Sequence, residues 1–310
     1  MKINNFLNDY LEGGSIPSVH NGNFERDKDN KMKVYYSGPY WDNKEVVAAI
    51  DALLNSKWLS SGQHVHQFEK AFSKKFNSES SLMVNSGSSA NLIMMASLKK
   101  YYGWEDGDEV IVSPVGFLAR SFAWWGRDCY CVGPANLLAC GTCGKRFDKW
   151  LPGYEGEVDH KYIFTNMGYN VKPLDMQGAI GSVQLKKFEE IHDNRRTSKK
   201  ALSNILNQYE GMRVPEELDN AHTSWFGTPV VCDIKTKRKL VSHLEEHNIQ
   251  TRPYFAGNIL MHPGYKHLDD YKKYPKATKV LDTVFFIGSS PHYNDDVFSY
   301  VEEVMKKWKG

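Results

Sequence analysis

The stretch SLMVNSGSSANLIMMASL, residues 81–98, decides the interpretation of the fold. The apolar run 81–84 is typical of a short buried strand, the polar residues 85–88 of a turn, and residues 89–100 of a helix. Backbone N–H groups at a helix N-terminus, with serine hydroxyls beside them, form a natural anion site. Gly87 permits close backbone approach. The same pattern also suits a capped helix start that binds nothing, so the residues alone leave both interpretations open.

The composition is that of an ordinary soluble globular protein. The 310 residues are 41% hydrophobic and 25% charged, with a formal net charge of +2. That length suffices for one large domain or two modest ones, and the small charge gives no case for nucleic-acid or membrane binding. No apolar run approaches the roughly 20 residues that span a bilayer. The N-terminal residues are too polar for a signal peptide, so we expect a cytoplasmic protein.

Hydrophobic spacing predicts helices with short strands between them in the first part, and a small α/β unit after it. Helices are expected over 43–56, 64–76, 176–194 and 197–209, with Asp175 as the cap of the third, and a strand over 109–115. In the small unit, strands are expected over 223–232, 250–255 and 283–287, and helices over 235–248 and 294–308. We place a domain boundary near 212–222. The predicted parts are an N-terminal arm (1–35), a large domain (36–215) and a small C-terminal domain (216–310).

Four of the five cysteines lie within one short loop, at Cys129, Cys131, Cys140 and Cys143. Thiolates at such spacing suit zinc or an iron–sulfur cluster, and the alternative is a set of reduced cysteines. Cys232 follows two valines and is expected to be plain core.

The second half contains two polar segments of interest. Residues 166–170, NMGYN, form a turn before the long predicted helix, and an amide there is able to reach an anion. Arg252 lies near aromatic residues in 251–255, where it either pairs with a phosphate or is a solvated charge. His262, His267 and His292 are scattered without metal-ligand spacing.

Seven ordered motifs together resemble one family. They are WLSSG (58–62), VNSGSSANL (84–92), SPVGF (113–117), RSFAWWGRDCYC (120–131), CGKRF (143–147), NMGYNVKPLDMQGAIGSVQL (166–185) and TRPYFAGNI (251–259). The chain resembles the pyridoxal-phosphate-dependent sugar aminotransferases and dehydratases of the DegT/DnrJ/EryC1/StrS family. The closest branch is the CDP-4-keto-6-deoxy-D-glucose 3-dehydratases of lipopolysaccharide biosynthesis.

The resemblance implies a role for each matching residue. Gly87, Ser88 and Ser89 would hold the phosphate of pyridoxal or pyridoxamine phosphate, Phe117 would stack on its ring, and Asn170 would reach the phosphate of the other subunit of a homodimer. Trp58, Ser60 and Arg252 would surround a nucleotide-linked sugar. Cys129, Cys131 and Cys143 match three of the four ligands of a [2Fe-2S] cluster, which a reductase partner would serve.

The resemblance also implies that a central segment is missing at 117/118. Relatives keep there the aspartate of the cofactor ring nitrogen, the catalytic lysine or histidine, and the first cluster cysteine, so no catalytic residue is assigned here. We therefore expect an α/β remnant of the fold-type I large domain, with poorly covered helices, plus a small α/β domain. The hypotheses are a nucleotide-sugar 3-dehydratase impaired by the deletion, a related aminotransferase, an inactive remnant, and a metal-binding structural protein.

Overall fold

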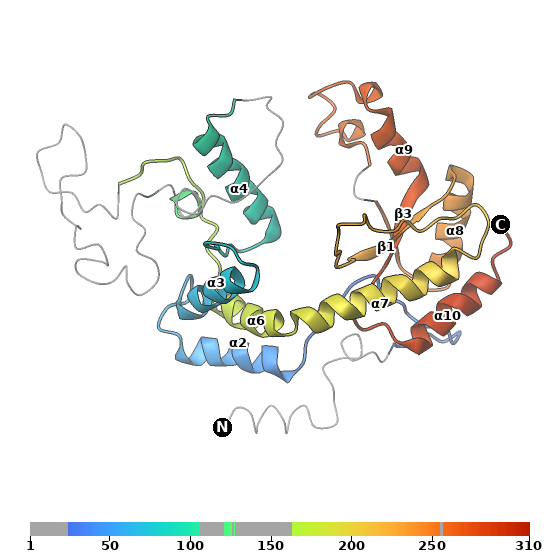
Figure 1. Cartoon of the computed structure of the whole chain (residues 1–310), viewed down its shortest axis with the longest axis horizontal. Coiled ribbons are helices and arrows are strands. Elements are labelled where there is room, and N and C mark those ends of the chain that lie inside the picture. Colours follow the sequence, from blue (N-terminus) through green and yellow to red (C-terminus); the bar gives the residue numbers. More distant parts are fainter. Residues whose placement is uncertain (1–23, 106–120, 126, 128–162, 255–256) are drawn as a thin grey trace, which may run out of the picture. The chain divides into compact units, whose positions relative to one another are not determined.

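A computed structural model describes residues 24–105, 121–125, 127, 163–254 and 257–310 (Figure 1). The chain divides into two compact units. Unit 1 comprises Met1–Asn4 and Asn43–Lys186, and unit 2 comprises Asn5–Asp42 and Lys187–Gly310. The boundary between the two compact units thus lies after Lys186. The domain boundary near 212–222 stays a prediction. In the described part of the chain, no helix is long and apolar enough to cross a membrane.

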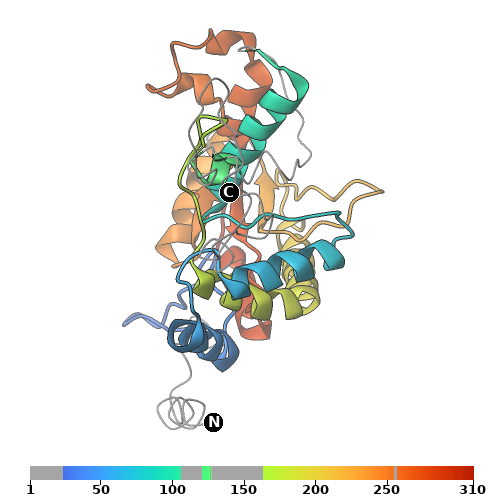
Figure 2. The same ribbon diagram turned by 90° about the vertical axis from the view of Figure 1, so that its left-hand side faces the viewer.

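The regular elements in the described part of unit 1 are helices. They are α2 (Asn43–Asn55), α3 (Gln63–Lys75), α4 (Gly87–Tyr102) and α6 (Asp175–Lys186). Helix α6 packs against both α2 and α3 (Figures 1 and 2). The buried Glu45 of α2 accepts a hydrogen bond from Gln184 Nε2 of α6 at 2.6 Å. The three helices predicted over 43–56, 64–76 and 89–100 are therefore confirmed.

Helices α3 and α6 approach each other closely at Gly178. A Cβ atom there would lie 2.4 Å from the backbone nitrogen of Val65, well inside van der Waals contact. Only glycine fits at this crossing, because any side chain would push one backbone away from the other.

The strand predicted over 81–84 is absent, and that prediction is wrong. The segment has no regular secondary structure and no ladder partner among the described residues. Instead, Met83 donates its N–H to Oε1 of the buried Glu69 in α3, at 2.9 Å. Residues 81–84 are only half-buried, and Leu82 and Val84 pack at the margin of a core. The apolar run thus indicated contact with a core, which does not require a neighbouring strand.

A second core in unit 1 joins α4 to the segments 121–125 and 169–172. Its buried residues are Ile93, Phe122, Ala123, Trp124 and Val171. Several apolar helix residues remain open in the same unit, as the sequence predicted. Leu53 and Leu54 of α2 are 57% and 65% exposed.

The long helix predicted over 176–194 is broken at Lys187, so this prediction is also wrong. Helix α6 ends at Lys186, and α7 (Phe188–Leu206) begins one residue after Lys187. Neither proline nor glycine stands at the break, so the sequence gives no local signal for it. Lys187 Nζ forms an ion pair with Asp42 Oδ2 at 3.0 Å.

Unit 2 contains a three-stranded antiparallel sheet in the order β1-β3-β2. The strands are β1 (Gly227–Val231), β2 (Thr251–Pro253) and β3 (Val284–Gly288). Gly227 lies opposite Gly288, and Thr251 opposite Ile287. The helices are α7, α8 (Ile234–Glu246), α9 (Pro275–Thr283) and α10 (Asp295–Lys306), with the short 3-10 turns η4 (Ile259–Met261) and η5 (Tyr271–Lys273). The small α/β unit is confirmed, and α9 is an addition to the prediction.

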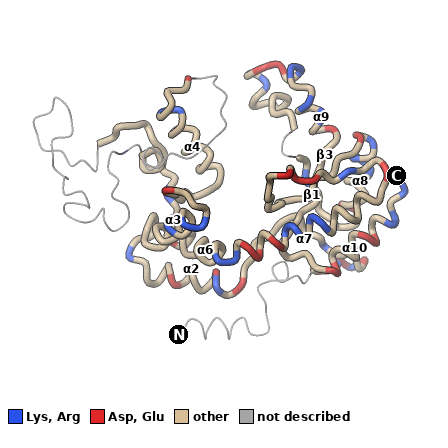
Figure 3. The backbone as a smooth tube through the Cα atoms, viewed as in Figure 1, with Lys and Arg blue, Asp and Glu red and all other residues tan. Residues whose placement is uncertain are grey.

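One core holds unit 2 together. It includes Leu202 and Leu206 of α7, Leu240 and Leu244 of α8, Phe285 and Ile287 of β3, and Val297, Val301 and Val304 of α10. Cys232 lies in this core and is 6% exposed, which confirms its assignment. Along α7, acidic residues come first and basic residues follow (Figure 3). This order suits a helix whose N-terminus carries partial positive charge.

Candidate functional site

The N-terminus of α4 has the form of an anion site. Ser86 is the N-cap, and its hydroxyl accepts the N–H of Ser89 at 3.2 Å. The Ser89 hydroxyl in turn donates to Asn85 Oδ1 at 2.7 Å. The serines thus fix the shape of the turn, with Gly87 and Ser88 exposed in the first turn of the helix.

Electrostatics and space both suit an anion at this turn. The first turn of α4 has no acidic residue, so no carboxylate of this turn offsets the positive end of the helix dipole. A Cβ atom at Gly87 would meet nothing within 4 Å, so this side of the turn is open. A phosphate fits such a turn, because backbone N–H groups and hydroxyls are its usual donors at helix N-termini.

Two backbone hydrogen bonds attach this turn to the rest of the second core. Asn85 donates its N–H to the carbonyl of Val171 at 3.0 Å, and Val171 donates its own to the carbonyl of Ala123 at 3.2 Å. Gln177 Nε2 also donates to the carbonyl of Asn85 at 3.4 Å. Asn170 is exposed and immediately precedes Val171, so it lies on the segment that anchors the turn. The structure therefore brings Asn170 to the neighbourhood of Gly87–Ser89.

The loop containing Trp58 and Ser60 is held by the segment before α6. Ser60 forms an isolated antiparallel bridge with Leu174, and Ser61 donates its N–H to the carbonyl of Pro173 at 2.9 Å. Trp58 and Ser60 are half-buried. A small pocket beside this loop is lined by Ser61, Gly62, Val65, His66, Glu69, Leu82, Met83 and Trp124.

In unit 2, Arg252 lies against an aromatic cluster. Its guanidinium carbon is 4.0 Å from the ring centroid of Tyr36. Tyr36, Phe226 and Phe286 form mutual edge-to-face or tilted contacts, with centroids 5.9–6.4 Å apart. The ring that Arg252 contacts thus comes from Tyr36 rather than from its own segment 251–255, and its role toward a phosphate stays a prediction.

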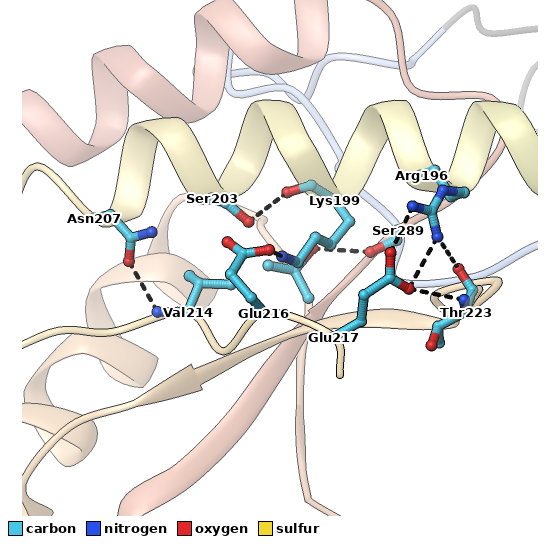
Figure 4. Close-up of polar contacts among 10 residues, drawn as sticks. Arg196, Lys199, Ser203, Asn207, Val214, Glu216, Glu217, Thr223 and Ser289 are labelled. Carbon is cyan, nitrogen blue, oxygen red and sulfur yellow. Dashed lines mark hydrogen bonds and ion pairs between the residues drawn. The ribbon is translucent and has the colours of Figure 1, made fainter. Parts of the chain in front are cut away.

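A polar network joins α7 to the loop before β1 (Figure 4). Arg196 donates to both carboxylate oxygens of Glu217, at 2.6 and 3.0 Å, and Thr223 donates its N–H to the same carboxylate at 2.8 Å. These bonds lower the pKa of Glu217 to about 2. The buried Lys199 pairs with Glu216 at 2.6 Å and lies 5.1 Å from the ring centroid of Trp225. The network fixes the loop to the helix.

Several predicted site residues lie outside the described residues. They are Phe117, Cys129, Cys131, Cys140 and Cys143. Within the described residues, no group of three or more metal-ligating side chains is found.

One cluster near the anion turn was missed by the sequence analysis. Lys172 Nζ lies 4.0 Å from the ring centroid of Trp125 and 5.0 Å from that of Trp124. The guanidinium of Arg127 lies 4.7 Å from the same Trp125 ring. A signal was present in the adjacent tryptophans of AWWGRD, but Lys172 is too distant in sequence for spacing to connect them.

The arrangement of helices and strands is shared with solved structures of sugar-modifying enzymes. Escherichia coli GDP-4-keto-6-deoxy-D-mannose-3-dehydratase with bound hydrated PLP superposes with a TM-score of 0.67, at 18% identity, over 87% of this chain and 98% of that one. The aminotransferase PseC of Helicobacter pylori superposes with the same score at 13% identity, over 89% and 98%. The fold is therefore that of the pyridoxal-phosphate-dependent sugar dehydratases and aminotransferases.

The sequence comparison gives the family. Lipopolysaccharide biosynthesis protein RfbH of Salmonella typhimurium is 32% identical over 200 residues, which cover 62% of this chain and 45% of that protein. The dTDP-4-dehydro-2,6-dideoxy-D-glucose 3-dehydratase of Saccharopolyspora spinosa is 35% identical, over 60% and 40%. The matches thus span less than half the length of these two relatives. A model of the DegT/DnrJ/EryC1/StrS aminotransferase family matches residues 41–126 and 150–306, so the chain belongs to that family.

Proposed function

We propose that this chain derives from, and retains the ligand sites of, a 3-dehydratase of a nucleotide-linked 4-keto-6-deoxyhexose. It would use pyridoxal or pyridoxamine phosphate, in the cytoplasm, in the biosynthesis of lipopolysaccharide or another deoxysugar product. The main support is the turn at the N-terminus of α4. It is capped by Ser86, has no acidic residue in the first turn of the helix and is open at Gly87, so it suits a phosphate. The names of the two relatives above, a lipopolysaccharide biosynthesis protein and a sugar 3-dehydratase, support the substrate class.

Each unit contains residues that are expected to bind a ligand. Gly87, Ser88 and Ser89 would bind the cofactor phosphate, and Asn170 would approach the phosphate bound by a second copy in a homodimer. Trp58, Ser60 and Arg252 would bind the nucleotide sugar, with the arginine opposite its phosphates. When bound, the cofactor would supply an electron sink. The residues named above would bind and orient the cofactor and the sugar, and none of them is assigned a proton-transfer step.

A comparison of lengths supports an internal deletion. The alignment to the Escherichia coli GDP-4-keto-6-deoxy-D-mannose 3-dehydratase runs over 383 positions, more than the 310 residues of this chain. The relative therefore carries residues without a counterpart here. We place the gap at 117/118, where the catalytic aspartate and lysine or histidine are expected. The consequence would be binding without efficient turnover, because deprotonation beside the sugar needs a positioned base.

Two alternatives follow from the same family. An inactive remnant would bind neither cofactor nor sugar. An aminotransferase relative would transfer an amino group to the sugar, and the name of PseC, an aminotransferase involved in the biosynthesis of pseudoaminic acid, supports this alternative. We retain as further parts of the proposal a [2Fe-2S] cluster on Cys129, Cys131 and Cys143, and a reductase that delivers electrons to it.

The experiment measures binding and turnover separately. Pyridoxamine phosphate is titrated into the protein by calorimetry, and a CDP-linked 4-keto-6-deoxy sugar is then added and followed by mass spectrometry. We expect binding that inorganic phosphate competes away, with little or no loss of the 3-hydroxyl. The variant Gly87→Asp, which places a carboxylate at the turn, should weaken binding at least tenfold.

The matched control is Gly264→Asp, which adds the same charge at another open position in unit 2. Its binding should equal that of the unaltered protein. Failure of the unaltered, folded protein to bind pyridoxamine phosphate would overturn the proposal. Efficient removal of the 3-hydroxyl would support the substrate class but would overturn the proposal that the deletion impairs turnover. Transfer of an amino group to the sugar would favour the aminotransferase alternative over the dehydratase.

A further inference from the structure

Two histidines lie four positions apart at the C-terminal end of α8. His243 belongs to the last turn of this helix, and His247 is its C-cap residue. Side chains at this spacing are neighbours on one face of a helix, and the two ring centroids are 4.6 Å apart. Both side chains are half-buried. This histidine pair, His243 and His247, is not among the residues assigned above to the cofactor or the sugar.

The hydrogen bonds of the histidine pair determine which ring nitrogens carry a proton. The Nε2 atom of His243 lies 2.9 Å from the carbonyl oxygen of Val304 in α10. The Nδ1 atom of His247 lies 2.7 Å from the carbonyl oxygen of His243. A carbonyl oxygen can only accept a hydrogen bond, so each of these two nitrogens donates its N–H. In the neutral rings, the lone pairs therefore lie on Nδ1 of His243 and Nε2 of His247.

This pattern of hydrogen bonds is typical of metal-binding histidines. A histidine that binds a metal through one ring nitrogen almost always donates the N–H of the other nitrogen to a carbonyl, a carboxylate or water, which orients the ring. Zinc–nitrogen bonds are about 2.0–2.1 Å long, so two imidazoles that share a zinc ion have ring centroids roughly 4.5–5.2 Å apart. The 4.6 Å between the centroids of the histidine pair lies within this range.

The position of the histidine pair in unit 2 also favours a bound cation. The last carbonyl groups of a helix carry partial negative charge, which attracts cations to the C-terminus of α8. Helix α10 contacts both histidines, because Tyr300 donates its hydroxyl to the carbonyl of His247 at 2.9 Å and Val304 accepts the N–H of His243. These contacts limit the freedom of the pair before a metal binds, which reduces the entropy lost on binding.

We propose that the histidine pair binds one divalent transition-metal ion of the Zn²⁺ and Ni²⁺ class, through Nδ1 of His243 and Nε2 of His247. Water supplies the other ligands, because no group of three or more metal-ligating side chains is found within the described residues. Imidazole suits these ions, whereas Mg²⁺ prefers oxygen ligands. The bound ion connects two residues of α8 and thereby stabilises the last turn of this helix.

Chemical modification followed by mass spectrometry tests this site one residue at a time. Diethyl pyrocarbonate acylates imidazole nitrogens that carry a lone pair, and a bound metal blocks the reaction. In the full-length protein, we expect excess Zn²⁺ to slow the modification of His243 and His247 at least tenfold. The same concentration of Mg²⁺ should change neither rate. The exposed His262 and His267 are internal controls, and Zn²⁺ should change their rates less than twofold.

If both rings bind one ion, the protection of each histidine should depend on the other. In His247→Gln, Zn²⁺ should no longer protect His243, and in His243→Gln it should no longer protect His247. The control variant His267→Gln alters an exposed histidine outside the pair and should leave the protection of both unchanged. Far-UV circular dichroism checks that the variants fold.

Hydrogen exchange provides a second measurement, which does not depend on the reactivity of the rings. Zn²⁺ should slow exchange in the last turn of α8 at least threefold in the unaltered protein, and should have no such effect in His247→Gln. Equal protection of all four histidines, or protection of His243 that persists in His247→Gln, would overturn the proposal. It would also be overturned if Zn²⁺ changed neither the modification of the histidine pair nor the exchange in α8. Zinc bound by cysteines elsewhere in the chain would not be mistaken for this site, since both measurements report on α8.

Discussion

Asp175 caps a helix to which it does not belong: its Oδ1 accepts the N–H of Val65 in the first turn of α3, at 3.0 Å. The N-cap position of α3 is Gly62, which has no side chain to make this bond. A Cβ atom on Gly62 would lie 2.6 Å from Cγ of Asp175, so the carboxylate occupies the space that a local cap would fill. The Ser56 hydroxyl donates to the other oxygen at 2.7 Å.

Replacing Asp175 should therefore loosen α3 rather than α6 alone. Asp175→Ala leaves the Val65 N–H and the Ser56 hydroxyl without their acceptor in a buried site, which costs about 1–3 kcal/mol. Hydrogen exchange followed by mass spectrometry should show faster exchange over Gln63–Lys75. Asp233→Ala, which removes the ordinary cap of α8, should instead affect Ile234–Glu246. Equal protection of α3 in the unaltered protein and in Asp175→Ala would contradict this assignment.

The contact between α3 and α6 predicts an unusual response to alanine. In a helix, glycine to alanine normally gains about 0.5–1 kcal/mol. At Gly178 the added methyl would meet the backbone of Val65 at 2.4 Å, and overpacking of this kind costs about 1–3 kcal/mol. Gly178→Ala should lower the urea midpoint of unit 1, read by hydrogen exchange of α3 and α6.

Gly181 in the same helix is the control. Its added methyl would meet the ring of Phe68 at 3.0 Å, and a side chain turns away more readily than a backbone moves. Gly181→Ala should change stability by less than about 1 kcal/mol, since the helix gain offsets the contact. If Gly178→Ala and Gly181→Ala changed stability equally, the close approach of α3 and α6 at Gly178 would not be the reason that glycine is needed there.

Local pattern predicted the helices and the small unit because apolar spacing and caps lie within a few residues of each other. The strand at 81–84 failed because a strand needs a partner, and the partner of Met83 is the carboxylate of Glu69. Helix α9 was missed although Pro275 occupies its first turn, a usual start signal. The break at Lys187 has no such signal.

In the candidate site too, sequence analysis could predict features formed by residues close together in the sequence, but not contacts between residues far apart in it. The turn around Gly87 could be recognised because strand-like residues, serines and a helix follow each other directly. The capping of α3 by Asp175 was instead predicted as a cap of its own helix. Lys172 was overlooked, since its meeting with Trp124 and Trp125 depends on the backbone pairing of segments far apart in sequence.

The carboxylate of Glu217 should titrate far below its usual range. Arg196 and the Thr223 N–H hold its pKa at about 2, against a reference of 4.5. Because the folded pKa is lowered, the stabilisation is present above pH 4.5 and is lost as the pH falls from there toward 2. Carbon-13 NMR of the glutamate carboxyls measures this directly. Arg196→Gln should raise the pKa toward 4.5, and an unchanged low value would show that Arg196 is not its cause.

The thiol of Cys232 should resist alkylation in the folded protein. Burial raises its pKa to about 11, so thiolate is scarce at pH 8, and the side chain is 6% exposed. Iodoacetamide at pH 8 should leave the Cys232 peptide unlabelled until denaturant is added, as measured by mass spectrometry. Rapid labelling without denaturant would mean that the core of unit 2 opens readily.

Arg252 offers the sharpest test of the nucleotide-sugar site, because it combines a charge with a planar contact. Its guanidinium lies 4.0 Å from the ring centroid of Tyr36, an arrangement that an ammonium group cannot reproduce with the same geometry. Arg252→Ala and Arg252→Lys should each weaken the binding of CDP about tenfold in calorimetry, corresponding to about 1.4 kcal/mol.

The exposed Arg238 of α8 is the control for net charge, and Arg238→Ala should bind CDP as the unaltered protein does. Restoration of binding in Arg252→Lys alone would show that charge suffices and that the stacking on Tyr36 has no part in it. Unchanged binding in both Arg252 variants would remove this residue from the site. If Arg238→Ala also weakened CDP binding, the effect of the Arg252 variants would be explained by long-range attraction alone. Salt screens such attraction over about 10 Å at 0.1 M, whereas a direct contact is screened less.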